Sequence, residues 1–256
     1  MSYKLTIDEV GELDPETVIV PVGSVEQHGH HLPVSTDVII AQAYADRIGE
    51  KLNAYVLPCL PISTCREHMG KRGSVWMNPD TFYQMLKDIV YSLKEQGFKK
   101  IIVIQGHGGI FVLHPLIRTL NAELNPDVMV CKFEPYQFFL PYIGKPPIPG
   151  CEASQILESA TVMHADEFET SVIMYLHPEL VHTDKIVDFV PQYPREYLNY
   201  GSIFRVSPDG VWGEPSKAAA EKGEKLLRVG CELGIKYIHE TFQFISEKGK
   251  YNYSDF

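Results

Sequence analysis

Short runs of β-branched residues mark the expected strands of this chain. One run spans Thr17–Pro21 and ends in a glycine turn at Gly23, and a second spans Ile101–Ile104 and ends at Gly106. A third run, Val128–Phe133, has the same character. Runs this apolar are typical of strands that are covered on both faces of a parallel sheet.

Segments with apolar residues at helical spacing alternate with these runs. They are Val38–Leu52, Asp80–Leu93, Phe111–Leu124, Asp166–Tyr175 and Lys217–Phe244. Alternating strands and helices predict an α/β fold in which helices cover both faces of a mostly parallel sheet. We therefore expect a three-layer α/β/α sandwich that forms one domain over residues 1–256.

Two segments do not fit this alternation. Residues Phe138–Gly150 are rich in proline and glycine, which favours an active-site flap or an arm that contacts another subunit. Residues Phe189–Arg205 are aromatic and irregular. Both predict surfaces that are better buried between subunits, so we expect a homo-oligomer.

Charge and composition exclude several classes of protein. The chain has 33 acidic and 23 basic side chains, a formal charge of −10, and no dense basic stripe. Such a chain would be repelled by a phosphate backbone, so nucleic acid is not expected as a partner. The first residues lack an apolar signal-peptide core, and no apolar run is long enough to span a membrane. We expect a soluble, cytoplasmic protein.

Two unusual loops follow the first two expected strands. The first places Glu26 and His28 two residues apart, with Asp37 at the start of the next helix, and the second places His107 among glycines. Ligands of open α/β sheets bind where such loops converge. Two carboxylates and two imidazoles suit Zn²⁺, Mn²⁺ or Fe²⁺, but hydrogen-bonded structural histidines and a helix-capping aspartate would give the same pattern.

Four motifs extend this picture over nearly the whole chain. They are GSVEQHGHHLPVSTD at 23–37, GHGG at 106–109, HADEFETS at 164–171 and GVWGEPSKAAAEKG at 210–223. In this order they resemble the creatininase, or creatinine amidohydrolase, family. The resemblance implies an α/β/α fold, two divalent metal ions per chain, hydrolysis of an amide C–N bond, and commonly a hexamer.

The same resemblance implies roles for individual residues. Glu26, His28, Asp37 and His107 would be metal ligands, with Asp37 bridging both ions, and His164 would carry a proton to the departing nitrogen. His68 and Ser74 would lie at the substrate. His30 and His31 are expected to lie near the ligands without binding metal.

The chain also departs from the family pattern. Creatinine-hydrolysing members carry a glutamate at the position of Gly109, so one metal ion lacks a ligand. Glu169 is the best substitute, although it could instead hydrogen-bond loop backbone; Glu167 is expected to be a solvated carboxylate in the first turn of a helix. Ala160 and Thr161 replace a Trp-Asp pair that holds the creatinine ring.

These observations predict an amidohydrolase that cleaves a non-peptide C–N bond, in a cyclic amide or a formamide, with a metal-activated water. Creatinine should be a poor substrate, and a larger amide should fit the space that Ala160 and Gly109 leave open, with Gly109 facing the substrate. Two alternatives stay open, a small-peptide hydrolase of the same family and a nonenzymatic α/β ligand-binding protein.

Overall fold

The fold is described by a computed structural model that covers residues 1–139 and 155–248. Most of the proline-rich segment 138–150 therefore lies outside the described residues. The helices are α1 (Ile7–Leu13), α2 (Thr36–Leu52), α3 (Pro79–Glu95), α4 (Leu113–Leu124), α5 (Glu167–Leu176) and α6 (Ala220–Lys248). The strands are β1 (Thr17–Val22), β2 (Tyr55–Val56), β3 (Lys100–Gln105), β4 (Met129–Phe133), β5 (Val162–His164) and β6 (Trp212–Gly213).

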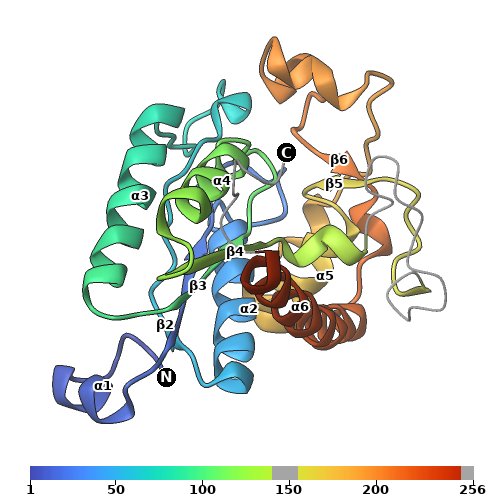
Figure 1. Cartoon of the computed structure of the whole chain (residues 1–256). Helices are drawn as coiled ribbons and strands as arrows, with labels where there is room; N and C mark the ends of the chain where they lie inside the picture. The colour runs from blue at the N-terminus through green and yellow to red at the C-terminus, as the bar shows by residue number, and fades with distance from the viewer. Residues whose placement is uncertain (140–154, 249–256) are drawn as a thin grey trace.

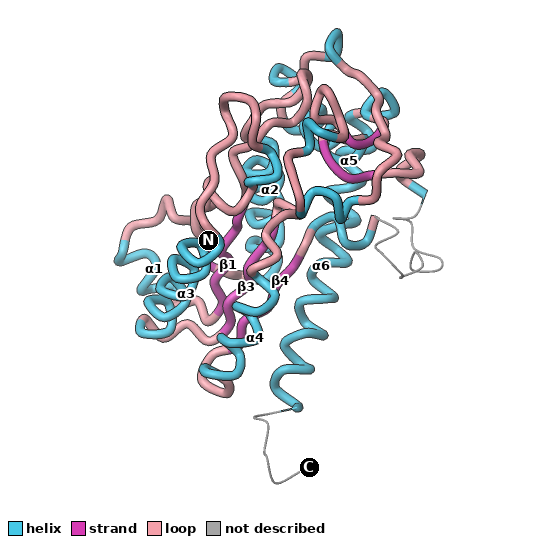
Figure 2. Tube along the Cα trace, turned by 90° about the horizontal axis from the view of Figure 1, so that it is seen from above, coloured by secondary structure: helices cyan, strands magenta, loops and turns pink. Residues whose placement is uncertain are grey.

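The central sheet contains four parallel strands in the order β2-β1-β3-β4. Helices α3 and α4 cover one face, and α2, α5 and α6 cover the other, as Figures 1 and 2 show. Strands β5 and β6 form a separate antiparallel pair. The predicted three-layer α/β/α architecture with a mostly parallel sheet is confirmed.

Alternation along the strands explains why both faces are covered. In β3, Ile101 and Val103 pack against α3 and α4, whereas Ile102 and Ile104 pack on the side of α2 and α6. All four side chains are fully buried. A strand with apolar residues in both positions of the two-residue repeat must be covered on both sides.

Helix boundaries differ from the sequence prediction by a few residues. Helix α6 begins at Ala220 rather than at Lys217, because Pro215–Lys217 forms a turn of 3₁₀-helix before it. The irregular segment 189–205 is built from loops and two 3₁₀ turns, Arg195–Asn199 and Ile203–Arg205.

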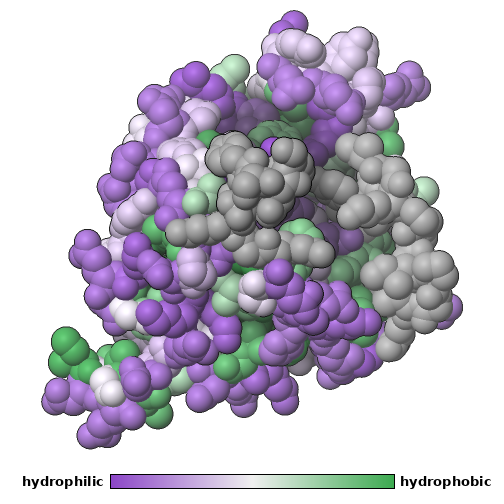
Figure 3. Space-filling view, viewed as in Figure 1, coloured by the Kyte–Doolittle hydropathy of each residue, from purple (hydrophilic) through white to green (hydrophobic). Residues whose placement is uncertain are grey.

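Helix α1 stands apart from the sandwich. None of its residues is buried, and Ile7 is 86% exposed. It forms the apolar patch at the lower left of Figure 3. Among the described residues, no helix combines the length and the apolar character needed to cross a membrane.

Candidate metal centre

The carboxyl ends of β1 and β3 bring the two unusual loops together. These strands pair in parallel with Val22 opposite Gln105, so the loops that follow them leave the sheet side by side. A Cβ atom at Gly106 would lie 2.7 Å from the Asp37 carbonyl oxygen. The missing side chain thus lets the first turn of α2 pack directly on the second loop.

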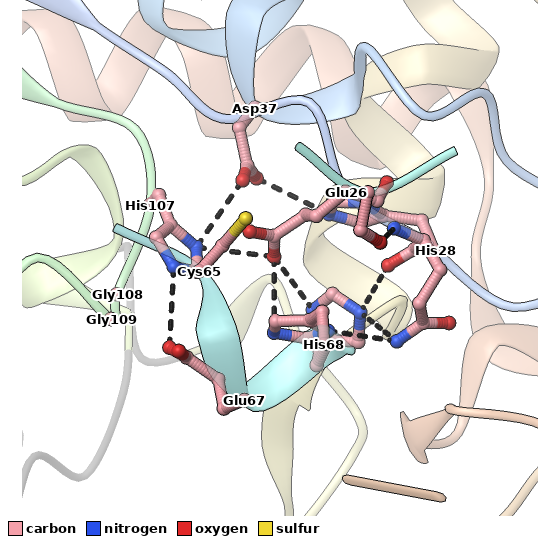
Figure 4. Close-up of polar contacts among 12 residues, drawn as sticks. Glu26, His28, Asp37, Cys65, Glu67, His68, His107, Gly108 and Gly109 are labelled. Carbon is pink, nitrogen blue, oxygen red and sulfur yellow. Dashed lines mark hydrogen bonds and ion pairs between the residues drawn. The ribbon is translucent and has the colours of Figure 1, made fainter. Parts of the chain in front are cut away.

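The His107 imidazole lies between two carboxylates at this edge. The Nδ1 atom of His107 lies 3.1 Å from Oε1 of Glu26 and 3.3 Å from Oδ2 of Asp37 (Figure 4). All three residues are buried. They come from the loop after β1, from α2 and from the loop after β3, which are the segments that the sequence places at this edge.

A second group shares Asp37 with the first. The other Asp37 oxygen, Oδ1, lies 3.2 Å from Nε2 of His28, and Oε1 of Glu169 lies 3.6 Å from the same nitrogen. The ligand-type atoms of His28, Asp37 and Glu169 are close enough to hold one ion. Each oxygen of the Asp37 carboxylate therefore faces a different histidine, as a bridging ligand would.

Neighbouring groups orient the two histidine rings. The Nδ1–H of His28 donates to the backbone carbonyl of Glu26 (3.2 Å), which directs Nε2 at Asp37 and Glu169. Beyond His107, Oε1 of Glu67 lies 3.4 Å from Nε2, the nitrogen that faces away from Asp37. Metal-binding histidines are typically held in this way through their second nitrogen.

Two further histidines lie beside the cluster and share one glutamine. The side-chain NH₂ of Gln27 contacts Nδ1 of His68 (2.9 Å) and the carbonyl of Gly210 (3.2 Å). Because these contacts use both amide hydrogens, His164 donates from Nε2 to the Gln27 backbone carbonyl (2.7 Å). Its Nδ1 then carries a lone pair, 3.7 Å from Oε1 of Glu26.

Burial and close charges shift the titration of the cluster. Burial raises the pKa of Glu26 to about 7. Burial also opposes ionisation of Asp37, but the facing His28 and His107 rings lower its pKa below the usual range. Burial lowers the pKa of His164 to about 3, and the neighbouring His28 acts in the same direction, so His164 is neutral.

The cluster has the properties of a cation site. Both oxygens of Glu26, Oδ2 of Asp37 and Nε2 of His28 are buried, and apart from the histidine–carboxylate contacts described above none of these atoms has a hydrogen-bond partner among the described residues. Buried polar atoms are normally satisfied. Mixed carboxylate and imidazole donors suit Zn²⁺ and Mn²⁺, so these residues fit divalent ions.

Sequence comparison agrees with this geometry. A family model described as creatinine amidohydrolase matches residues 3–238 of the chain. The chain belongs to the creatinine amidohydrolase family. The resemblance predicted from the four motifs is confirmed.

Relatives within the family differ in their reactions. The chain is 26% identical to the creatinine amidohydrolase of Pseudomonas putida, over 85% of this chain and 86% of the relative. It is 30% identical to a mycofactocin precursor peptide peptidase of Mycolicibacterium smegmatis, over 86% and 84%. Both matches span most of each protein.

Solved structures of the family share the fold. The crystal structure of a creatinine amidohydrolase homologue from Bacteroides fragilis is 27% identical, with a TM-score of 0.76 over 94% of this chain and 96% of that one. Two creatininase structures at 24% identity, a Zn–Zn form of a mutant and a manganese form, have TM-scores of 0.76 and 0.77 and cover 93% of this chain and 97% of each.

The two acidic residues of the HADEFETS motif have separate environments. Glu169 directs Oε1 toward His28 and accepts the Ala165 N–H with Oε2 (2.6 Å), so the two interpretations of this residue are compatible. Glu167 is not solvated, as the sequence suggested, but fully buried. Its carboxylate accepts backbone N–H groups of Glu158 and Ser159 and pairs with Lys222 (2.6 Å).

The space beside Gly109 is not open, contrary to the prediction. A Cβ atom built on Gly109 would lie 1.9 Å from Oε1 of Glu67, so the Glu67 carboxylate fills the place where a side chain at 109 would begin. Sequence reasoning missed Glu67. Its position next to His68 was the available signal, because a carboxylate adjacent to a pocket histidine reaches the same site.

The remaining predicted site residues have clear positions. His68 is buried, lines the cavity, and directs Nε2 at Glu26 (3.2 Å). The hydroxyl of Ser74 accepts the Gln27 N–H (3.0 Å), and Ser74 is absent from the described residues that line the cavity. His31 is buried against Thr170 (3.0 Å), and His30 faces Asp209 (3.1 Å) at the surface.

A cavity opens from the cluster and defines what can reach it. His107, His164 and Glu169 form its inner wall. Trp212 and Phe168 also line it, so an aromatic face is present although Ala160 replaces the family's tryptophan. Ala160 is absent from the described residues that line this cavity, so the predicted gain of space there is not seen.

Proposed function

We propose that this chain is a metal-dependent amidohydrolase that cleaves a non-peptide C–N bond in a cyclic amide or a formamide. The observation that carries the proposal is the Asp37 carboxylate between His28 and His107, in a buried cluster where the Glu26 oxygens and Oδ2 of Asp37 have only histidine nitrogens as polar neighbours. Family membership supports the reaction class.

Two divalent ions per chain are the proposed cofactors, with zinc or manganese favoured and iron(II) possible by ligand chemistry. Glu26, Asp37 and His107 would hold one ion, and His28, Asp37 and Glu169 would hold the other. Bound divalent ions supply a water of lowered pKa and polarise an amide carbonyl. Zinc and manganese forms of creatininase with the same fold support the choice of metals.

His164 is the proposed proton carrier. With its proton on Nε2 and bonded to Gln27, its Nδ1 faces the cluster as an acceptor. It can take a proton from the attacking water and return it to the leaving nitrogen. Gln27 fixes the tautomer, and the buried His68 ring packs 4.3 Å from the His164 ring and limits its rotation.

A covalent mechanism has less support. Cys65 lies near the cluster, but burial raises the pKa of its thiol to about 12, so it is not a thiolate near neutral pH. The sequence contains no GxSxG motif. Water is therefore the proposed nucleophile.

Hydrolysis of a small peptide is the second candidate function, because the relative at 30% identity is a peptide peptidase. A nonenzymatic binding protein has no comparable support. The test is an assay of the zinc- and manganese-loaded protein on creatinine, N-formyl compounds and short peptides. We expect kcat/KM for creatinine to stay below about 10⁴ M⁻¹s⁻¹ and at least one other amide to exceed it.

The His164→Ala variant provides the control for this assay. General acid–base groups contribute about 10²- to 10⁴-fold, so its kcat should fall within that range while its metal content stays unchanged. Efficient creatinine turnover would contradict the substrate assignment. Failure of every amide to react would contradict the proposed function itself.

A homo-oligomer, as a hexamer, is part of the same proposal. The segment around residues 187–200 exposes apolar and aromatic side chains, with Tyr200 79% exposed and Tyr193 53% exposed. Such exposure is typical of surfaces that contact another subunit. Light scattering at micromolar concentration should give a mass several times 29.0 kDa, and a monomer would refute the assembly.

A further inference from the structure

The glycine next to His107 has polar groups on both sides. A Cβ atom at Gly108 would lie 3.4 Å from Nη2 of Arg195 and 3.5 Å from the hydroxyl of Tyr136. Gly108, Tyr136 and Arg195 all line the cavity that reaches the metal cluster. Two donor groups from distant parts of the chain therefore flank one point, a single residue away from a metal ligand.

The Tyr136 hydroxyl has no partner there. It is buried and makes no hydrogen bond with the described residues, and Tyr136 lies in the 3₁₀ turn Pro135–Phe138 that follows β4. Its ring packs edge-on against Phe168 with centroids 6.4 Å apart. Burial raises the pKa of this hydroxyl well above its ordinary value, so it keeps a proton to donate. An unpaired buried donor is unfavourable, and a ligand that accepts its hydrogen bond removes that cost.

The Arg195 guanidinium is fixed in place but not neutralised. It donates from Nη2 to the Gly108 carbonyl (3.1 Å), and its Cζ atom lies 5.1 Å from the centre of the Phe111 ring. No carboxylate of the described residues lies within ion-pair distance of it. Its remaining N–H groups donate to none of the residues that the structure describes and can bind a ligand in the cavity.

The acidic residues around the cavity already have partners. Glu134 pairs with Lys132, Glu67 lies beside His107, and Glu169 lies beside His28. Asp166 accepts the Glu169 N–H (3.0 Å) at the start of α5. Arg195 is the only lysine or arginine among the described residues that line the cavity. At this wall, Arg195 is therefore a cation that no described carboxylate pairs with directly.

We propose that Arg195 and Tyr136 form a subsite for a carboxylate of the substrate, so that the amide cleaved at the metal cluster belongs to an amido acid. A guanidinium and a hydroxyl offer donors to both oxygens of one carboxylate. This inference rests on the proposed hydrolase function and specifies its substrate class. One arginine beside Glu67 and Glu134 matches a monoanion better than a phosphate dianion.

The test uses probes that are anchored at the metal and differ only at the tail. Hydroxamates, which chelate divalent ions, are prepared with one to four methylenes and a tail ending in a carboxylate, a primary carboxamide or a phosphonate. Dissociation constants for the zinc-loaded full chain are measured by calorimetry. Because no turnover is required, binding is measured independently of amide hydrolysis.

At the best tail length, the carboxylate should bind about 10- to 100-fold more tightly than the carboxamide, the range expected for charge-assisted hydrogen bonds. Arg195→Ala should abolish this difference without changing carboxamide binding, and Tyr136→Phe should reduce it. Arg205→Ala removes an exposed charge from the same segment and should leave it unchanged. Thermal melting and metal content identify variants that fail to fold.

Four results would overturn the inference. Equal binding of carboxylate and carboxamide, or an undiminished difference in Arg195→Ala, would remove the subsite but leave the hydrolase intact. Tighter binding of the phosphonate than of the carboxylate would show that the subsite takes a phosphate group instead of a carboxylate. Absence of binding by every hydroxamate would refute the metal centre and the inference with it. Carboxylate selectivity without hydrolysis of any N-formyl amino acid would support the subsite and contradict the proposed function.

Discussion

The interior of the sheet and its carboxyl edge are equally hidden from water but opposite in chemistry. Val20 in β1 and Ile102 in β3 are 0% exposed, and so are Glu26 and His28 in the loop that follows β1. The interior gains stability from apolar area removed from water. The edge instead gathers charges that need an ion or each other. Burial alone therefore cannot identify a core; the partners of each buried group decide its role.

We expect the largest effect from a substitution of Asp37, because its two carboxylate oxygens face different histidines, His28 and His107. Asp37→Asn weakens the contacts to both His28 and His107, so we expect loss of both proposed metal ions and a fall in activity on the order of 10³-fold. Metal analysis and kinetics check this. Asp46→Asn, an exposed substitution on the same helix, is the control. Full metal content in Asp37→Asn would contradict the assignment.

Removing apolar volume from the interior should affect stability and leave the edge alone. Leu86 on α3 is fully buried in the cluster between α3, α4 and the sheet. Leu86→Ala should lower the free energy of unfolding by about 2–5 kcal/mol with unchanged metal content and kcat. Lys87→Ala, at a half-buried neighbour that pairs with Glu123 at the surface, should cost less than about 1 kcal/mol. Denaturant titrations measure the unfolding free energy of both variants. Equal losses in Leu86→Ala and Lys87→Ala would contradict this prediction.

A substitution of Glu167 tests whether a buried, paired carboxylate outside the metal cluster stabilises the fold. Its pKa is lowered, because Lys222 and the N–H groups of residues 158 and 159 outweigh the effect of burial. Glu167→Gln should cost about 1.5–3 kcal/mol at pH 7. A lowered folded-state pKa stabilises the fold above the unfolded pKa of about 4.3, and that contribution is lost as pH falls through the folded value.

The wild type and Glu167→Gln should therefore differ by a constant amount from pH 7 to about pH 5 and converge below about pH 4. Unfolding free energies measured across this range test the sign. Exposed Glu221→Gln, in the first turn of α6, is the matched control. If the difference in unfolding free energy between wild type and Glu167→Gln grew as the pH fell, the contacts of Glu167 would not lower its pKa in the folded state.

We expect the smallest effect from a substitution of Glu67, whose carboxylate lies where a side chain at position 109 would begin. Glu67→Gln should weaken metal binding about 10- to 100-fold, because Glu67 holds the outer nitrogen of His107. Gly109→Glu should clash with Glu67 and disrupt the site. The double variant Glu67→Ala/Gly109→Glu has room for the new side chain and should bind metal better than Gly109→Glu alone. Chelator competition measures the metal affinity of all three variants. Equal affinities of Gly109→Glu and the double variant would show that Glu67 does not occupy the place of a side chain at position 109.

The spacing of apolar residues predicted the helices and strands that are long enough for that spacing to repeat. The strands β1, β3 and β4 and five of the helices were expected from their apolar spacing. The two- and three-residue strands β2, β5 and β6 were missed, because so few residues cannot show a two-residue repeat. Helix α1 was also missed, since its apolar residues contact no core and leave no buried stripe.

The candidate site was readable only where its residues are close in sequence. Glu26, His28 and Asp37 share one loop and the helix after it, and the structure brings His107 to them. Glu67, Tyr136 and Arg195 reach the cavity from three other segments. Of these residues, Glu67 alone has a signal in the sequence, its neighbour His68. Only the folded chain shows that Glu67 fills the space beside Gly109.

The candidate ligands come from chain segments up to about 140 positions apart, from Glu26 to Glu169. An unfolded chain cannot bring them together, so a cation that binds there binds the native state alone. By mass action, free metal at 100 times its dissociation constant would add about 2.7 kcal/mol to the stability of the protein. The lifetime of this protein in a cell would then depend on the supply of metal as well as on its own sequence, and starvation for the metal would weaken the fold as well as stop the reaction.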